Sequence, residues 1–156
     1  MFVRRFSLPA AAVASAVAAV VGLATVPLPA MAASTIVLSG IQYDPAGTDT
    51  RTNAHLNQEF FTIRNLSTRP RNLSGFRVKD VANHTFVFPA GYVLAGRTTA
   101  IIRTGRNRNT ATTLYWNQYN YIWNNTGDTA RFQTPAGVTF DWCSYTAMAG
   151  RTRVAC

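Results

Sequence analysis

From residue 34 onward, short runs of β-branched and aromatic residues alternate with turns rich in Gly, Pro, Asn and Asp. Almost none of these runs has the period of an amphipathic helix. Turn signals recur about every 8 to 12 residues, a spacing typical of a β-sandwich or barrel. The pattern therefore predicts an all-β domain. The expected strands are residues 34–43, 58–65, 73–80, 84–89 and 97–105, followed by the runs TLYW, NYIWNN, TARFQTP and VTFDWCSY.

The segment between residues 115 and 124 contains five aromatic residues, which belong either to the core or to a binding surface. If this segment were one extended strand, one face would be aromatic and the other mostly polar. Phenylalanines in the other expected strands favour a core position for these rings, because the two sheets of a sandwich pack large hydrophobic side chains against each other. Tyr and Trp are seldom fully buried, so we expect some of Tyr115, Trp116 and Tyr119 to stay exposed.

The first 32 residues have the three parts of a secretory signal peptide. Arg4 and Arg5 precede an apolar, Ala-rich run over residues 10–24, and Ala30-Met31-Ala32 provides a small-residue cleavage site. A membrane anchor is the alternative, but two prolines break the run and no basic cluster follows it. We therefore expect cleavage after Ala32 and a secreted protein of one domain, residues 33–156, with no membrane span. Such a protein either diffuses away or stays at the cell wall.

Both cysteines lie near the end of the sequence, at Cys143 and Cys156. An exported chain meets an oxidising environment, where an even number of cysteines indicates pairing. A Cys143–Cys156 bridge would close a loop of about 14 residues and stabilise the fold by about 3 kcal/mol. A reactive thiol is the alternative, but no histidine lies near either cysteine in the sequence to activate it.

Six blocks of the sequence, taken in order, resemble the lamin-tail domain in its bacterial, secreted, stand-alone form. The blocks read LNQEFFTIRN, NLSGFRVKD, HTFVFPAGYVLAG, IIRTGRNRNTATTLYW, YIWNNTGDTARFQTPAG and VTFDWCSY, and their order and spacing match the family pattern across residues 36–145. The resemblance implies an immunoglobulin-like β-sandwich of roughly 7 to 9 strands with Trp123 in its core. It also implies a tight turn between paired strands, formed by Asn124, Asn125, Gly127 and Asp128. The family is non-enzymatic in known contexts and supplies no catalytic residue, cofactor or ligand.

The residues themselves give little support to an enzyme. His55 and Glu59 are close in sequence, and we interpret them as a chance pair at the surface rather than an acid–base pair. His84 begins an expected strand and is interpreted as a surface or edge residue. We therefore expect no catalytic residue and no cofactor.

The loop at residues 44–57 offers oxygen ligands of the kind that Ca²⁺ binds, at Asp44, Asp49, Asn53 and Asn57. It lacks the spaced carboxylates and the terminal Glu of an EF-hand loop. We interpret it as an ordinary turn region rich in Asp and Asn, with calcium binding as the open alternative.

The expected mature chain is strongly basic. Without Arg4 and Arg5 it has 13 basic residues against six acidic residues, a net charge of +7. Arg103, Arg106 and Arg108 fall within six residues on one expected loop. The alternatives are a cationic surface that only confers solubility and a surface that weakly binds a polyanion such as teichoic acid, extracellular DNA or anionic lipid. Smaller basic pairs stand at Arg69 and Arg71 and at Arg151 and Arg153.

Two functions of different classes remain. The first is a secreted structural or adhesive module that binds an unidentified protein or the cell envelope without catalysis. The second is a weak polyanion- or carbohydrate-binding module that uses Arg103, Arg106 and Arg108. Exposure of Tyr115 or Tyr119 beside these arginines separates the two, because an exposed ring would add a stacking surface to the charge.

Overall fold

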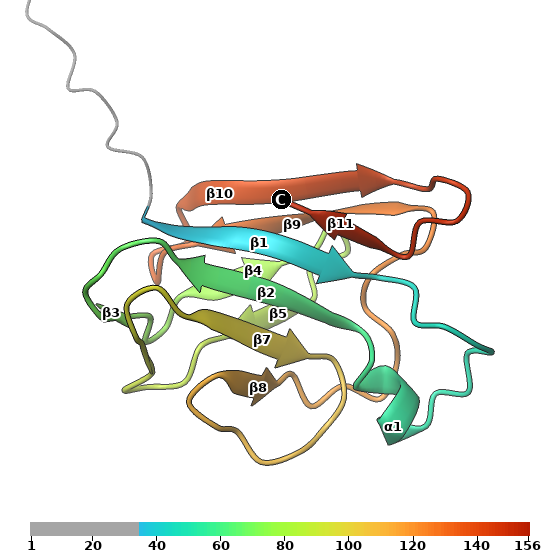
Figure 1. Cartoon of the computed structure of the whole chain (residues 1–156), viewed down its shortest axis with the longest axis horizontal. Coiled ribbons are helices and arrows are strands. Elements are labelled where there is room, and N and C mark those ends of the chain that lie inside the picture. Colours follow the sequence, from blue (N-terminus) through green and yellow to red (C-terminus); the bar gives the residue numbers. More distant parts are fainter. Residues whose placement is uncertain (1–34) are drawn as a thin grey trace, which may run out of the picture. The chain divides into compact units, whose positions relative to one another are not determined.

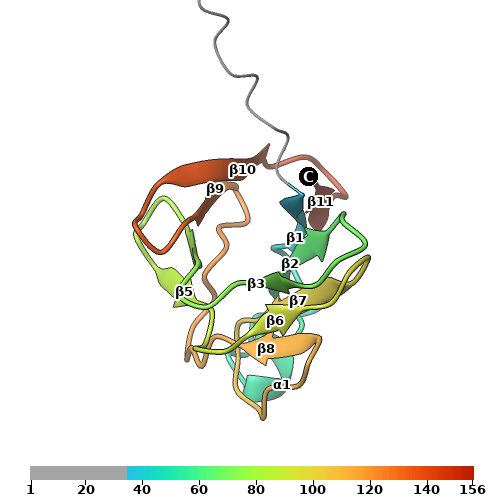
Figure 2. The ribbon, with the colours of Figure 1, turned by 90° about the vertical axis from the view of Figure 1, so that its left-hand side faces the viewer.

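A computed structural model describes residues 35–156, which fall within one compact unit, Ala32–Cys156. The signal peptide predicted at residues 1–32 lies outside the described residues. Two principal sheets face each other, as Figure 2 shows, with β5, β9 and β10 on one side and β1, β2, β7 and β8 on the other. The immunoglobulin-like β-sandwich expected from the sequence is therefore confirmed.

The two principal sheets contain nine strands. The first sheet has the order β11 (Arg153–Ala155), β1 (Ile36–Gln42), β2 (Phe60–Asn65), β7 (Thr99–Arg103) and β8 (Thr113–Tyr115). The second has the order β10 (Thr139–Thr146), β9 (Gly127–Gln133), β4 (Arg77–Lys79) and β5 (Thr85–Val87). A small two-stranded sheet pairs β3 (Arg71–Asn72) with β6 (Val93–Leu94), and one short helix, α1 (Asn53–Leu56), precedes β2. The pairing of β7 with β8 is parallel, whereas the other strand pairs in the described chain are antiparallel.

Alternation of side chains along the strands builds the core between the two sheets. In β9, for example, Ala130 and Phe132 are fully buried, while Arg131 between them faces outward. Rings from both sheets meet edge to face: Phe61 of β2 lies 5.8 Å from Phe86 of β5, centroid to centroid. Aromatic pairs in this arrangement stabilise a core beyond their buried area.

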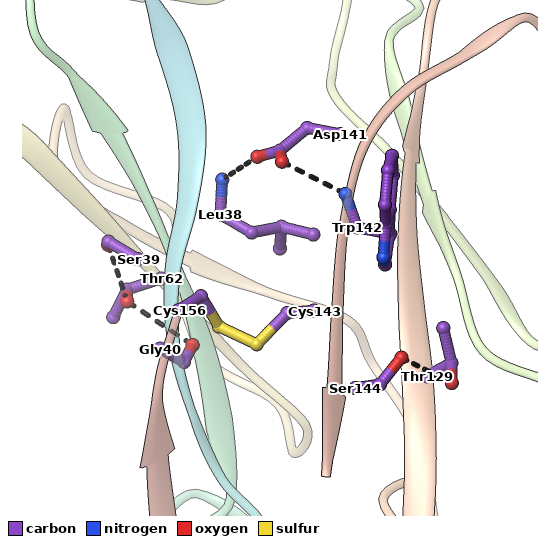
Figure 3. The surroundings of a disulfide bond; sticks show 10 residues. All are labelled: Leu38, Ser39, Gly40, Thr62, Thr129, Asp141, Trp142, Cys143, Ser144 and Cys156. Carbon is purple, nitrogen blue, oxygen red and sulfur yellow. Dashed lines mark hydrogen bonds between the residues drawn. A yellow bond between two sulfur atoms is a disulfide. The ribbon is translucent and has the colours of Figure 1, made fainter.

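One side of the sandwich is closed by contacts between β1 and β10. The backbone N–H of Leu38 in β1 donates to Oδ2 of Asp141 in β10 at 2.7 Å. Register shifts occur at both places, between Leu38 and Gly40 and between Thr139 and Asp141. The predicted disulfide is present nearby and joins Cys143 of β10 to Cys156, directly after β11 (Figure 3). The bridge therefore ties an edge strand of one sheet to an edge strand of the other.

The aromatic segment is not one extended strand, so the expected two-faced alternation is wrong. Strand β8 ends at Tyr115, and residues 116–126 run without regular structure into β9. Asn117 turns the chain with a φ of 63°. As a result, Trp116, Ile122 and Trp123 are buried, whereas Tyr119 is exposed. The segment thus contributes both to the core and to the surface.

The turn implied by the resemblance lies at the start of β9. The N–H of Gly127 donates to the carbonyl of Asn124 at 3.1 Å, and the φ of Gly127 is 139°. A Cβ at this glycine would lie 2.9 Å from the carbonyl oxygen of Tyr145, so the position requires glycine. Asp128 accepts from the backbone and side-chain nitrogens of Asn124, and Asn125 donates to Asp44. The residues before this turn are not a strand, so it does not join two paired strands as expected.

Candidate binding site at the loop between β7 and β8

Helix α1 interrupts the polar 44–57 loop and organises the site. Thr52 caps the helix by accepting from the backbone N–H of His55. The ring of His55 is largely buried, with Nδ1 bonded to the hydroxyl of Tyr121 and Nε2 lying 3.1 Å from the carbonyl of Ala46. His55 therefore connects α1 to two other segments of the chain, those of Ala46 and Tyr121. Its interpretation as a surface residue is wrong. His84, in contrast, is exposed as expected and bonds Asp80.

Glu59 is fully buried and does not pair with His55. Its carboxylate accepts from the hydroxyl of Thr104 at 2.5 Å and from the backbone N–H groups of Ile122 and Trp123 at about 3 Å. Burial raises the pKa of Glu59 to about 7, although these three hydrogen bonds each lower it. The carboxylate fixes the irregular 116–126 segment to the body of the sandwich. The sequence interpretation of Glu59 as a surface residue is therefore wrong.

The loop between β7 and β8, residues 104–112, is docked on α1 by amide side chains. Asn53 accepts from the N–H of Arg106 at 2.7 Å and donates to its carbonyl at 2.9 Å, and Asn57 donates to the same carbonyl. Gly105 allows this approach, because a Cβ there would clash with the Oδ1 atoms of Asn57 and Asn53. In Figure 1, α1 lies near the end of β7, from which this loop leaves.

The docked loop places Arg106 against an exposed ring. The guanidinium carbon of Arg106 lies 3.9 Å from the centroid of Tyr119, a cation–π contact. The side chain of Tyr119 is 72% exposed, and Arg108 is exposed two residues beyond Arg106. The exposed ring beside arginine, which favours the polyanion hypothesis, is therefore present. Tyr115 is half-buried.

Arg103 is separated from the other two arginines by its role in the fold. It belongs to β7, donates to the carbonyl of Asn57 and lies over the ring of Phe60. Its guanidinium is thus already engaged within the domain. The candidate site consists of Arg106, Arg108 and Tyr119.

The candidate calcium ligands of the 44–57 loop have different surroundings in the structure. Asp44 accepts from Asn125, Asn53 bonds Arg106, and Asp49 is exposed. Among residues 35–156, no group of three or more His, Cys, Asp and Glu side chains has an arrangement that could hold a metal ion. The structure thus assigns Asp44 and Asn53 to loop packing.

A shallow groove of about 560 Å³ lies between the end of β10 and the hairpin before β11. Its polar residues are engaged in the fold: Asp128 is buried, and the hydroxyl of Tyr145 donates to the carbonyl of Asn124. Burial raises the pKa of Tyr145 far above its ordinary value. The groove therefore offers no free acid or base from these two residues.

The fold agrees with the comparison to known families. The sequence model of the lamin tail domain family matches residues 29–147. The chain belongs to the lamin tail domain family. This is a family of non-catalytic, immunoglobulin-like domains. A comparison with curated proteins found no match. Within residues 35–156, no helix is long and apolar enough to span a membrane.

Four polar residues of the lamin tail blocks, Glu59, Asn65, Asp80 and Asp128, are buried in this domain, and each bonds backbone. Besides Glu59, Asn65 donates to the carbonyls of Arg69, Leu94 and Ala95 at 2.9 to 3.1 Å. Asp80 accepts from the N–H of His84, and Asp128 accepts from the N–H groups flanking its turn. Sequence reasoning missed these roles. The signal in the sequence that could have indicated these roles is the position of single acidic or amide residues next to hydrophobic strands.

Proposed function

We propose that this lamin tail domain is a secreted, non-enzymatic adhesive module that attaches to the cell envelope by binding an anionic polymer. The observation that carries the proposal is the contact between Arg106 and the exposed ring of Tyr119. Phosphates of the polymer contact Arg106 and Arg108, and Tyr119 supplies a stacking surface beside them. A membrane-bound or catalytic role draws no comparable support from the described residues.

The distribution of carboxylates supports an anionic ligand. Three of the six acidic residues, Glu59, Asp80 and Asp128, are buried. They contribute little negative charge at the surface, so the arginine side chains define the potential that a ligand meets.

The salt dependence of binding follows from the number of free arginines. Because Arg103 is engaged within the domain, Arg106 and Arg108 give about two phosphate contacts and a slope of roughly −1.8 in log K against log salt. Affinity then falls about 12-fold between 50 and 200 mM salt.

The test is a binding assay of the purified protein against cell wall that carries teichoic acid, wall stripped of teichoic acid, and duplex DNA. We expect salt-dependent binding to the teichoic acid wall or to DNA and none to the stripped wall. The double variant Arg106→Gln/Arg108→Gln should abolish it, and Tyr119→Ala should weaken it.

The matched control is Arg69→Gln/Arg71→Gln, which removes the same charge from another exposed turn. If both double variants lose affinity equally, the arginines act only as net charge and the site assignment fails. Binding to stripped wall that does not depend on salt would point instead to a protein or other uncharged partner.

A further inference from the structure

The second sheet presents an outward face that the proposed loop site does not use. Strand register places Trp142 of β10 opposite Arg131 of β9, and Arg131 opposite Lys79 of β4. All three point away from the core, because their neighbours Cys143, Phe132 and Val78 are buried. Adjacent strands lie about 4.8 Å apart, so the three residues form a straight row across the sheet.

Trp142 is the exposed tryptophan of the described chain, and its ring takes no part in the core. Its side chain is 67% exposed, whereas the other two tryptophans, Trp116 and Trp123, are buried. Among residues 35–156, no ring or cation packs against the ring of Trp142 within contact range. Figure 3 shows Trp142 on the side of β10 away from the disulfide. A large, open aromatic surface of this kind is typical of a recognition site.

The two cations of the row are free to bind a ligand. In the described part of the chain, neither Arg131 nor Lys79 forms a side-chain hydrogen bond or an ion pair. Asp80, next to Lys79, and Asp128, three residues before Arg131, are both buried. Asp141, next to Trp142, is turned toward β1, where it accepts from Leu38 (Figure 3). The row therefore combines one open aromatic ring with two unpaired positive charges.

The surroundings of the row are polar. Thr129 and Ser144 form the next cross-strand pair, with their hydroxyls 2.9 Å apart. Gln133 lies beyond Arg131 on the same face and bonds the hydroxyl of Thr139. Hydroxyl and amide groups around one aromatic ring suit a ligand with many hydroxyls. A row of side chains that extends across three strands suits an extended polymer better than a small molecule, which needs a concave site.

We propose that this face of β4, β9 and β10 binds an acidic polysaccharide. One sugar ring stacks its C–H face on Trp142, because the negative face of the indole attracts polarised C–H groups. Carboxylates of neighbouring uronic acid units pair with Arg131 and Lys79, and the Arg131 pair can be bidentate. Single-stranded nucleic acid is the less favoured ligand, because its binding surfaces stack successive bases on several rings. This row offers only one.

The position of Trp142 makes the site directly measurable. Because the other two tryptophans are buried, quenching of fluorescence by acrylamide reports mainly on Trp142. The probes are oligogalacturonate and hyaluronan oligosaccharide, with methyl-esterified oligogalacturonate as the uncharged match and oligo(dT) as the nucleic acid. We expect at least one of the two uronate oligomers to protect Trp142 from quenching, while the methyl ester protects less than one-tenth as well.

Variants separate this face from the loop site, and calorimetric titration measures their affinity. Trp142→Ala should lower the affinity for the uronate oligomer about tenfold, and Arg131→Gln/Lys79→Gln should abolish its salt dependence. Arg106→Gln/Arg108→Gln should leave this affinity unchanged, so failure of the loop site and failure of this one are distinguishable. Val138→Ala, an exposed residue outside the row, is the matched control for loss of apolar surface.

Three results would overturn the proposal: no protection by either uronate oligomer, protection by oligo(dT) alone, or unchanged affinity of Trp142→Ala. Near-ultraviolet circular dichroism of each variant shows whether the core is intact. If Trp142→Ala alters the core, Trp142→Phe supplies the second test, and it should retain part of the affinity.

Discussion

Glu59 is a buried acid whose donors come from two separate parts of the chain, Thr104 and the backbone at residues 122–123. Its pKa of about 7 lies above the ordinary value of 4.5, mainly because burial penalises the charged form. The folded protein therefore keeps a proton that the unfolded chain releases between these pH values. The contribution of Glu59 to the free energy of unfolding is therefore largest below about pH 4.5, and it is lost as the pH rises to about 7.

We predict that the free energy of unfolding falls by about 3 kcal/mol between pH 4.5 and 7 because of Glu59. Glu59→Gln cannot titrate, so it should lack this part of the pH dependence. Urea unfolding at several pH values measures both proteins. Parallel curves for the wild type and the variant would show that Glu59 does not change its protonation on folding.

Trp123→Ala should destabilise the domain by about 3–5 kcal/mol, because it removes a large side chain from the core. The ring of Trp123 is buried and packs edge-on against Phe61 and Trp116. The matched control is Trp142→Ala, which removes the same side chain from the surface and should change stability by less than about 0.5 kcal/mol. Equal melting temperatures for the two variants would contradict the core role of Trp123.

At the scale of single residues, the sequence allowed the disulfide to be predicted and missed Glu59. A cysteine pair in an exported chain has few alternatives. A carboxylate beside a strand, in contrast, gives no local sign of whether it is buried, because its partners Thr104 and Ile122 are distant in sequence.

At the scale of elements, strands with their own hydrophobic pattern were predicted near their observed bounds, as for β1, β2 and β9. The irregular conformation of residues 116–126 was not predicted. It depends on a turn at Asn117 and on hydrogen bonds to Glu59, which is distant in sequence. Likewise, α1 is too short to show a period, and β11 follows from pairing with β1.

Docking of the 104–112 loop on α1 should depend on Gly105. We predict that Gly105→Ala displaces Asn57 and Asn53 and so frees the loop, because the added Cβ overlaps their Oδ1 atoms. Hydrogen exchange at the N–H of Arg106 should rise at least about tenfold, while exchange in β2 stays slow. Unchanged protection at Arg106 would show that the loop accommodates the methyl group.

Reduction of the disulfide should destabilise the domain by about 3 kcal/mol without unfolding it. The bridge joins the C-terminal end to β10, and Cys143 is one member of a core that is otherwise built from the hydrophobic side chains of both sheets. Thermal melting with and without reductant, compared with Cys143→Ser/Cys156→Ser, measures the effect. Two free thiols by mass spectrometry of the protein purified without reductant would contradict the bridge.

At the scale of the whole molecule, the family match ends at residue 147, whereas β11 lies beyond it. Strand β11 covers the outer edge of β1, and Tyr43 donates to the carbonyl of Arg151 in the preceding hairpin. An uncovered edge of β1 would be open to pairing with another chain.

We therefore predict that a chain shortened after residue 147 associates more strongly with itself than the full chain does. Light scattering at equal concentrations measures the difference. The control is Cys143→Ser/Cys156→Ser, which lacks the bridge but keeps β11. If the control associates as strongly as the shortened chain, the disulfide rather than β11 protects this edge.

The parallel pairing of β7 with β8 has a consequence for how such domains diversify. Ile101 pairs with Thr113 and Arg103 with Tyr115, so the 104–112 loop leaves the end of β7 and crosses back to the start of β8, its neighbour in the same sheet. With both ends fixed, doubling the length of this loop costs only about 0.6 kcal/mol in closure entropy. Evolution can thus change the length and sequence of the proposed binding loop while the framework of the domain stays unaltered. The same segment is a place where a foreign peptide can be grafted.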